Sequence, residues 1–351
     1  MTDVRDGWKN FAMSAYCGLG LCRLVLGMEG LRGQSIRIIT YHRILDIPDR
    51  DSFPFDPTLI DAGVDQFRQQ MRCISQDYDL ITFDDVIRHL DVGEGLPKRP
   101  LLVTFDDGYD DIYKYAYPVL RDMNIAATLL LTTGYIGGTE TFWYDWLAFI
   151  VLNTQADAIE VGDAREKLAL GRSRAERMTA LQHLMRRIGG MQNEARERFL
   201  QDVERGYGSV YSRQTDDIKA LSRPLSWDQV REMCGGGMRI GSHTVTHPFL
   251  SKVDSERLYR ELVDSKKHIE QETGLKASVL AYPNGQPDDY NASVRRAVRD
   301  AGYELALSYT NGVNRIGNID RFAMNRLHVP LNGGADRFRI LLSSAAAIWK
   351  H

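Results

Sequence analysis

The sequence predicts an α/β fold in which a parallel barrel or a wound sheet is surrounded by helices. From residue 35 onward, short strand-like segments alternate with segments whose apolar residues recur at helical spacing. Polar residues of the types used in catalysis and metal binding also stand at the ends of two of the strand-like segments. With 351 residues, the chain can bury a substantial core, either as one large barrel with an insertion or as two domains.

The first half of the chain alternates predicted strands and helices. Strands are expected at residues 35–40, 80–83, 101–105 and 127–132. Helices are expected at residues 64–74, 84–90 and 117–123. The first of these helices shows the clearest period, with apolar residues at Val64, Phe67, Met71 and Ile74.

The same alternation continues in the second half. Strands are expected at residues 238–243, 278–282 and 304–308, and helices at residues 227–233, 254–274 and 292–301. Ser226 and Gln229 have the spacing of a capping box at the start of the first helix. Gly274 and Gly302 are expected at the ends of the other two.

Two regions depart from this pattern. Residues 140–224 begin with an aromatic run and continue as an Arg-rich stretch of helical propensity, which predicts a mainly helical insertion. Residues 1–33 predict an amphipathic helical segment, because Arg23 interrupts an apolar run too short to span a membrane. This segment could make peripheral membrane contact or dock onto the domain.

Charge, cysteine content and the start of the chain bear on the class of partner and on the cellular location. The 44 basic and 47 acidic residues give a net charge of −3, which does not favour a nucleic-acid partner. The four cysteines are scattered and form no disulfide framework. The start of the chain lacks a convincing signal peptide. We therefore expect a cytoplasmic protein, or one peripheral on the inner face of the membrane.

Two polar motifs at strand ends predict a metal-assisted hydrolase. Asp106 and Asp107 directly follow the strand-like segment 101–105, and His243 ends the segment 238–243, with His247 four residues later. Asp107 with the two histidines makes a set of two imidazoles and one carboxylate, which leaves positions open for water and substrate. Asp106 then stays free to take a proton from the attacking water.

Three motifs follow one another along the chain: Thr-Phe-Asp-Asp-Gly at 104–108, Ser-His-Thr-Val-Thr-His-Pro at 242–248 and Ala-Tyr-Pro-Asn-Gly at 281–285. In this order they resemble the polysaccharide deacetylases with a NodB homology domain, carbohydrate esterase family 4. The resemblance implies a distorted (β/α)7-type barrel over residues 34–351. It also implies that Asp106 is the general base and that Asp107, His243 and His247 bind the metal.

The third motif fits the family less closely. Many members carry an arginine at the position of Ala281, where it braces the catalytic base, and that arginine is absent here. A backbone N–H of this loop helps to hold the oxyanion in the family, so Asn284 and Tyr282 are candidate oxyanion and substrate residues. A plain turn after a strand explains the same residues about equally well.

A general acid must protonate the leaving amine, and His42 and His328 compete for this role. Many members take this histidine from a C-terminal Leu-His, as at His328, but the aspartate and tryptophan motif that accompanies it is missing. A circularly permuted subgroup acting on poly-N-acetylglucosamine takes it from an N-terminal Tyr-His, which resembles residues 41–42. The motif layout is closest to that subgroup. We favour His42 and keep His328 as the alternative.

The expected function is a metal-dependent hydrolase that removes N-acetyl groups from an amino sugar. Its substrate would be an exopolysaccharide, a lipopolysaccharide precursor, a related glycan or a lipid-linked sugar. The alternatives are hydrolysis of another non-peptide C–N bond and glycan binding by a decayed site. One divalent ion is expected, with zinc as the first choice and cobalt, nickel, iron or manganese as alternatives.

Overall fold

The computed structural model describes residues 34–161, 166–329 and 334–343. The predicted N-terminal helical segment, residues 1–33, lies outside the described residues. No helix within the described ranges is both long enough and apolar enough to cross a bilayer.

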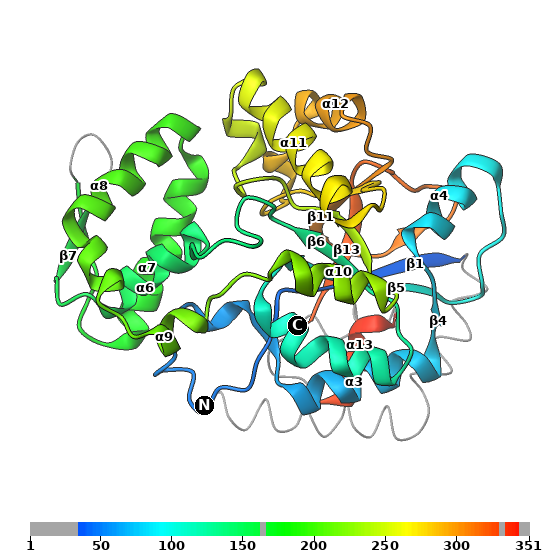
Figure 1. The fold of residues 1–351 in the computed structure, drawn as a ribbon, viewed down its shortest axis with the longest axis horizontal. Helices are drawn as coiled ribbons and strands as arrows, with labels where there is room; N and C mark the ends of the chain where they lie inside the picture. Colours follow the sequence, from blue (N-terminus) through cyan, green and yellow to red (C-terminus); the bar gives the residue numbers. More distant parts are fainter. Residues whose placement is uncertain (1–33, 162–165, 330–333, 344–351) are drawn as a thin grey trace.

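Seven parallel strands form a closed barrel (Figure 1). In chain order and in order around the barrel they are β1 (Ser35–Tyr41), β5 (Pro100–Asp107), β6 (Thr128–Leu131), β9 (Arg239–Ser242), β10 (Val279–Ala281), β11 (Leu305–Asn311) and β13 (Met324–His328). β1 closes the ring by pairing with β5 on one side and β13 on the other. The predicted (β/α)7-type barrel is therefore confirmed, because every barrel pairing is parallel.

Shorter strands extend or flank the barrel. β4 (Asp79–Leu80) adds to β5 in parallel, and β12 (Asn314–Arg315) adds to β1 in antiparallel orientation. β2 (Arg43–Ile44) pairs with β3 (Ile60–Ala62) just after β1 ends. This last pair places the segment after β1 close to the mouth of the barrel.

Helices cover the outside of the barrel. The α-helices are α3 (Val64–Asp77), α4 (Phe83–Val92), α5 (Tyr117–Asp122), α10 (Trp227–Gly235), α11 (Ser255–Thr273), α12 (Ala292–Asp300) and α13 (Ala335–Leu342). Short turns of other helix types are η1 (Pro57–Leu59), η2 (Ile112–Ala116), η3 (Leu250–Lys252) and η4 (Pro287–Asp289). The predicted capping box at Ser226 begins α10, and Gly274 in the left-handed region ends α11, so both boundary predictions are confirmed.

Two local predictions need correction. The predicted strand at residues 80–83 ends at Leu80, because Thr82 and Asp85 form a capping box that begins α4 at Phe83. The strand β13 has no counterpart among the predicted elements. Its sequence, Met-Asn-Arg-Leu-His, mixes polar and apolar residues and lacks the apolar run by which the other strands are recognised.

Between β6 and β9, further elements form a lobe beside the barrel (green, at the left in Figure 1). They are α6 (Trp143–Asn153), β7 (Ala158–Val161), β8 (Glu166–Ala169), α7 (Arg174–Gly190), α8 (Asn193–Ser212) and α9 (Asp216–Ala220). This lobe occupies the stretch in which the helical insertion is predicted. Almost every residue of α6 is buried, whereas α7 and α8 bury one face each.

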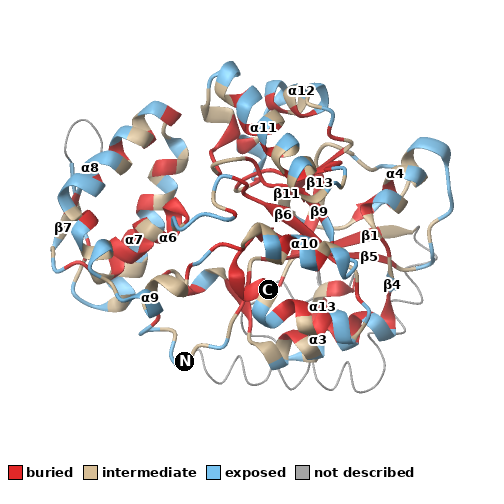
Figure 2. Cartoon of the chain, in the orientation of Figure 1, coloured by how far each residue is buried: buried red, intermediate tan, exposed pale blue. Residues whose placement is uncertain are grey.

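The interior of the barrel is a separate apolar core. Residues that alternate along the strands point inward and pack together, among them Ile36, Ile38, Leu102, Leu130, Val279, Leu305 and Met324. Figure 2 shows the buried residues concentrated on the strands, with exposed residues on the outer faces of the helices. Because this core fills the centre of the barrel, polar side chains are left to gather at its carboxyl end.

We expect Leu130→Ala to lower the free energy of unfolding by about 2–5 kcal/mol, because it opens a cavity inside the barrel. Leu130 is fully buried, whereas Val92, at the end of α4, is 76% exposed. Val92→Ala is the control and should change stability by less than about 0.5 kcal/mol. Urea unfolding measures both, and equal effects would contradict the assignment of Leu130 to the core.

Candidate active site

A pocket of about 330 Å³ opens at the carboxyl ends of the barrel strands. Of the eight predicted site residues, all but His328 line it: His42, Asp106, Asp107, His243, His247, Tyr282 and Asn284. They come from the end of β5 and from the segments that follow β1, β9 and β10. Strand ends far apart in the sequence therefore meet in one place, as expected for a parallel barrel.

Asp107, His243 and His247 form a compact set of ligand atoms. The three atoms that could face one ion lie within 4.8 Å of one another, and all three residues are buried. His243 Nε2 lies 3.6 Å and His247 Nε2 3.7 Å from Asp107 Oδ1. Asp107 Oδ1 is buried without a hydrogen-bond partner among the described residues. Two imidazole nitrogens and one carboxylate oxygen are ligand atoms that suit a divalent transition-metal ion.

The protonation of these ligands also suits a cation. Burial lowers the pKa of His247 well below its usual value, and the neighbouring His243 adds to the effect. His247 is therefore neutral, which is the ligand form of imidazole. Burial raises the pKa of Asp107, because the surrounding groups only partly offset the cost of a buried carboxylate charge. A positive ion between the three residues would remove that cost.

Backbone geometry aims the ligands at one another. Asp107 has φ 69°, which departs from the extended backbone of β5, and both Asp107 and Asp106 line the pocket although they are consecutive residues. His243 Nδ1 lies 2.9 Å from the Ala281 carbonyl oxygen, so Nδ1 carries the proton and Nε2 faces Asp107. Ala281 thus serves the site through its carbonyl.

Asp106 forms a fully buried ion pair with Arg326, which corrects the expectation that the base lacks a bracing arginine. Arg326 donates from a terminal guanidinium nitrogen to Asp106 Oδ1 at 2.7 Å. The same nitrogen reaches Thr40 Oγ1 at 3.1 Å, and Nε donates to the Ser308 carbonyl at 2.9 Å. The arginine comes from β13, which β11 separates from β10, so position 281 could not reveal it.

This pairing sets the charge of Asp106. Burial disfavours the carboxylate, but Arg326 and then His243 together outweigh burial and hold the pKa of Asp106 well below its usual range. Asp106 is therefore ionised at neutral pH. It lies beside the metal ligand set and can accept a proton.

The structure distinguishes between the two candidate acids. His42 lines the pocket, and its Nδ1 lies 3.5 Å from Asp61 Oδ2 on β3. Burial lowers the pKa of His42, but the hydrogen bond and charge of Asp61, with Asp106 and Asp107, outweigh burial and raise it to about 9. Burial, Arg326 and His42 instead lower the pKa of His328 to about 4. Of these two histidines, the shifted pKa values therefore favour the cationic form at neutral pH for His42 and the neutral form for His328.

His328 has a packing role. It stacks on Tyr309 with ring centroids 3.6 Å apart and planes inclined by 18°. Tyr309 in turn lines the pocket, beside His42 and beneath the guanidinium of Arg326. His328 therefore supports the wall of the site from behind.

Asn284 and Tyr282 take different positions. Asn284 has φ 57°, and its Nδ2 is buried without a hydrogen-bond partner among the described residues, so its amide can donate to a ligand in the pocket. The Tyr282 hydroxyl donates to the Phe322 carbonyl at 2.9 Å, and its ring stacks on Tyr290. The hydroxyl of Tyr282 thus donates within the protein, while the residue itself lines the pocket.

The sequence profile of the polysaccharide deacetylases matches residues 93–306, which is more than half of the chain. The chain belongs to the polysaccharide deacetylase family. A poly-β-1,6-N-acetyl-D-glucosamine N-deacetylase from Staphylococcus epidermidis is 35% identical over 76 residues, or 21% of this chain and 26% of that protein. The segments matched in the first two curated relatives span only 30% and 26% of their lengths.

Solved structures share the fold of this polysaccharide deacetylase. The Streptococcus pyogenes deacetylase PplD, in complex with acetate, aligns with a TM-score of 0.58 at 20% identity, over 89% of this chain and 99% of that one. IcaB from Ammonifex degensii aligns with a TM-score of 0.53 at 19% identity, over 88% and 97%. At these identities the likeness concerns the fold.

Sequence reasoning missed three residues of the deacetylase site. Arg326 precedes His328 by two positions, so the alternation of a strand would have placed both on one face. Asp61 lies on a three-residue strand with no pattern to mark it. Tyr144 lines the pocket from the inserted helix α6, with its ring centroid 5.0 Å from that of His247. The aromatic run at 142–146 was the signal for Tyr144.

We expect Arg326→Met to lower the free energy of unfolding by about 3–5 kcal/mol at neutral pH, because it leaves the buried Asp106 charge unpaired. Without the guanidinium, burial should raise the pKa of Asp106. The deficit relative to the wild type should then be smaller at about pH 5 than at about pH 8, since protonation removes the unpaired charge.

Urea unfolding of the single variants and of the Arg326→Met, Asp106→Asn double variant measures this coupling. The exposed pair of Arg321 and Asp91 provides the control, and Arg321→Met should cost no more than about 1 kcal/mol. A deficit that does not depend on pH or on Asp106 would contradict the pairing.

Proposed function

We propose that this polysaccharide deacetylase is a metal-dependent N-deacetylase of an N-acetylated amino sugar in an exopolysaccharide, a lipopolysaccharide precursor or a related glycan. One observation carries the proposal. A single pocket holds an ionised carboxylate, a three-residue ligand set and a protonated histidine, which are the base, the metal site and the acid that amide hydrolysis requires.

Asp107, His243 and His247 would hold the divalent ion, with zinc as the first choice for two imidazoles and one carboxylate. When bound there, such an ion would polarise the acetamide carbonyl and raise the acidity of the attacking water. Its three protein ligands leave room for both groups.

Asp106 takes the proton from the water as the water oxygen attacks the carbonyl carbon. Its pairing with Arg326 keeps it charged and fixes its orientation. The same pairing makes Asp106 a weak base, so it suits only a water that is more acidic than bulk water. Arg326 also removes one reason for considering a decayed site, the missing arginine at position 281, because it pairs with Asp106 from another strand.

His42 gives its proton to the nitrogen of the amino sugar as the C–N bond breaks, and acetate and the free amine leave. An amine is a poor leaving group unless it is protonated, so the acid must still carry a proton at the working pH. Asp61 meets this requirement by raising the pKa of His42. Asp61 also accepts the backbone N–H of His42 at 2.5 Å, which fixes the loop.

Asn284 would stabilise the reacting carbonyl by donating a hydrogen bond to its oxygen. Its unpartnered amide lies in the pocket wall, and a donor held there costs no reorganisation when negative charge develops on the oxygen. Poly-β-1,6-N-acetyl-D-glucosamine is the first substrate to test, because one relative is named for acting on it. Lipid-linked N-acetylhexosamines are the second.

Acetate release from poly-β-1,6-N-acetylglucosamine oligosaccharides tests the proposal. We expect release by the metal-reconstituted wild type. Asp106→Asn should abolish turnover and keep the metal, because Asp106 is outside the ligand set. Asp107→Ala or His243→Ala should lose both metal and activity. Acetate release by Asp106→Asn at the wild-type rate would contradict the assigned base, and metal analysis by mass spectrometry separates the two classes of variant.

The pH dependence of turnover tests the acid. Because the reaction needs protonated His42, activity should fall as pH rises through its pKa. Asp61→Asn removes the charge that raises this pKa, so the basic limb of the profile should move to lower pH. His42→Gln should reduce kcat by about 100- to 10,000-fold with metal retained, whereas His328→Gln should cost far less. A larger loss at His328 than at His42 would reverse the assignment.

A further inference from the structure

The loop that carries His247 adopts an unfavourable backbone conformation. It follows β9, and two of its residues other than glycine, Thr244 and His247, have φ values of 70° and 55°. Residues other than glycine rarely adopt such positive φ values, and β-branched threonine is among the least suited to them. Such a conformation persists only when neighbouring groups hold it in place.

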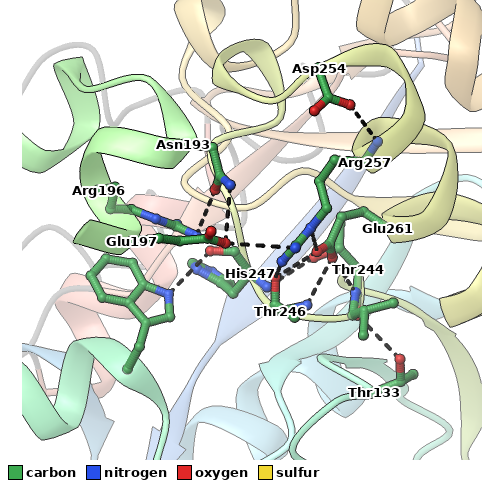
Figure 3. Close-up of polar contacts among 12 residues, drawn as sticks. Thr133, Asn193, Arg196, Glu197, Thr244, Thr246, His247, Asp254, Arg257 and Glu261 are labelled. Atoms are coloured by element: carbon green, nitrogen blue, oxygen red, sulfur yellow. Dashed lines mark hydrogen bonds and ion pairs between the residues drawn. The ribbon is translucent and has the colours of Figure 1, made fainter. Parts of the chain in front are cut away.

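Glu261, on the buried face of α11, holds this loop from one side (Figure 3). Its Oε2 accepts the backbone N–H groups of Val245 and Thr246, both at 2.8 Å. Its Oε1 accepts the Thr246 hydroxyl at 2.6 Å. Three donors from two consecutive residues thus converge on one carboxylate that is 2% exposed.

Arg257 completes this side of the loop. It lies one turn before Glu261 on α11, and its Nε donates to Glu261 Oε1 at 2.9 Å. A terminal nitrogen of the same guanidinium donates to Thr246 Oγ1 at 3.1 Å, and the other lies 3.6 Å from Glu197 on the inserted helix α8. The charge of Glu261 is therefore paired.

Trp143, at the start of the inserted helix α6, holds the loop from the other side. Its indole Nε1 donates to the His247 carbonyl oxygen at 3.3 Å. The ring is buried, and the guanidinium of Arg196 on α8 lies 5.1 Å from its centroid. The insertion thus contacts the backbone of a metal ligand through a fixed, buried side chain.

We propose that Glu261 is a positioning residue for the metal ligand His247, and that Trp143 shares this task from the inserted lobe. The inference rests on the proposed metal site. Neither residue contacts the pocket, and both act through the backbone of residues 245–247. Without Glu261, two partly buried N–H groups lose their acceptor and the loop can leave the left-handed conformation that points His247 at Asp107.

Metal affinity of Glu261→Gln tests the inference without relying on catalysis. The amide keeps the size of the side chain but offers one acceptor oxygen in place of two. We expect the Kd for Zn²⁺, measured by competition with a chromophoric chelator, to rise about 10- to 100-fold. The visible absorption of the Co²⁺ form should also change, because the coordination geometry at His247 changes.

Glu270→Gln is the matched control. Glu270 lies on the same helix, and its carboxylate also accepts a backbone N–H, that of Ala277 at 3.1 Å, but it makes no contact with the loop. This variant should leave the Kd and the Co²⁺ spectrum as in the wild type. An equal effect in both variants would mean that Glu261 only stabilises α11, and it would overturn the proposal.

A wild type that binds Zn²⁺ beside a Glu261→Gln variant with the same Kd and spectrum would also overturn the inference. A wild type that binds no Zn²⁺ would instead overturn the proposed function. If Glu261→Gln fails to fold, Trp143→Phe decides, since it removes only the indole donor. We expect it to weaken Zn²⁺ binding about 2- to 10-fold, and an unchanged Kd would overturn the proposal that residues 245–247 are held in place for His247.

Discussion

The pairing of β1 with β5 closes the barrel and fixes which side chains meet at its mouth. Its register places Tyr41 opposite Phe105, so the next residues, His42 and Asp106, emerge side by side. On its other edge, β1 pairs with β13, which carries Arg326. The proposed acid, the proposed base and the arginine that pairs with Asp106 therefore come from three adjacent strands or their ends, although they lie far apart in the sequence. An open sheet would separate them.

Closure has an electrostatic consequence. Asp106 and Arg326 are each 1% exposed, and burying either charge alone would be costly. The pair keeps Asp106 ionised inside the molecule, whereas Asp107, one residue later, has no arginine partner among the described residues and would be available to the proposed cation. Two neighbouring carboxylates thus take different roles because their surroundings differ. The positive φ of Asp107 departs from the extended backbone of β5, and both aspartates line one pocket although they are consecutive in the chain.

The sequence predicted those parts of the protein that depend on local pattern. Apolar runs and helical spacing located most of the barrel strands and the helices α3, α10, α11 and α12, and motif spacing brought Asp107, His243 and His247 together. Arg326 escaped prediction because its strand has no apolar run and becomes a neighbour of β5 only through β1. Glu261 and Trp143 escaped because they act through hydrogen bonds to a loop backbone, which no side-chain pattern records.

Anomalous diffraction from crystals grown with zinc, recorded at the zinc absorption edge, tests the central claim most directly. The account predicts one peak among Asp107, His243 and His247, with ligand distances of about 2.0–2.2 Å and with Asp106 outside the coordination sphere and still paired with Arg326. No peak at this place, or a peak with Asp106 as a ligand, would contradict the proposal that Asp107 binds the metal while Asp106 acts as the base.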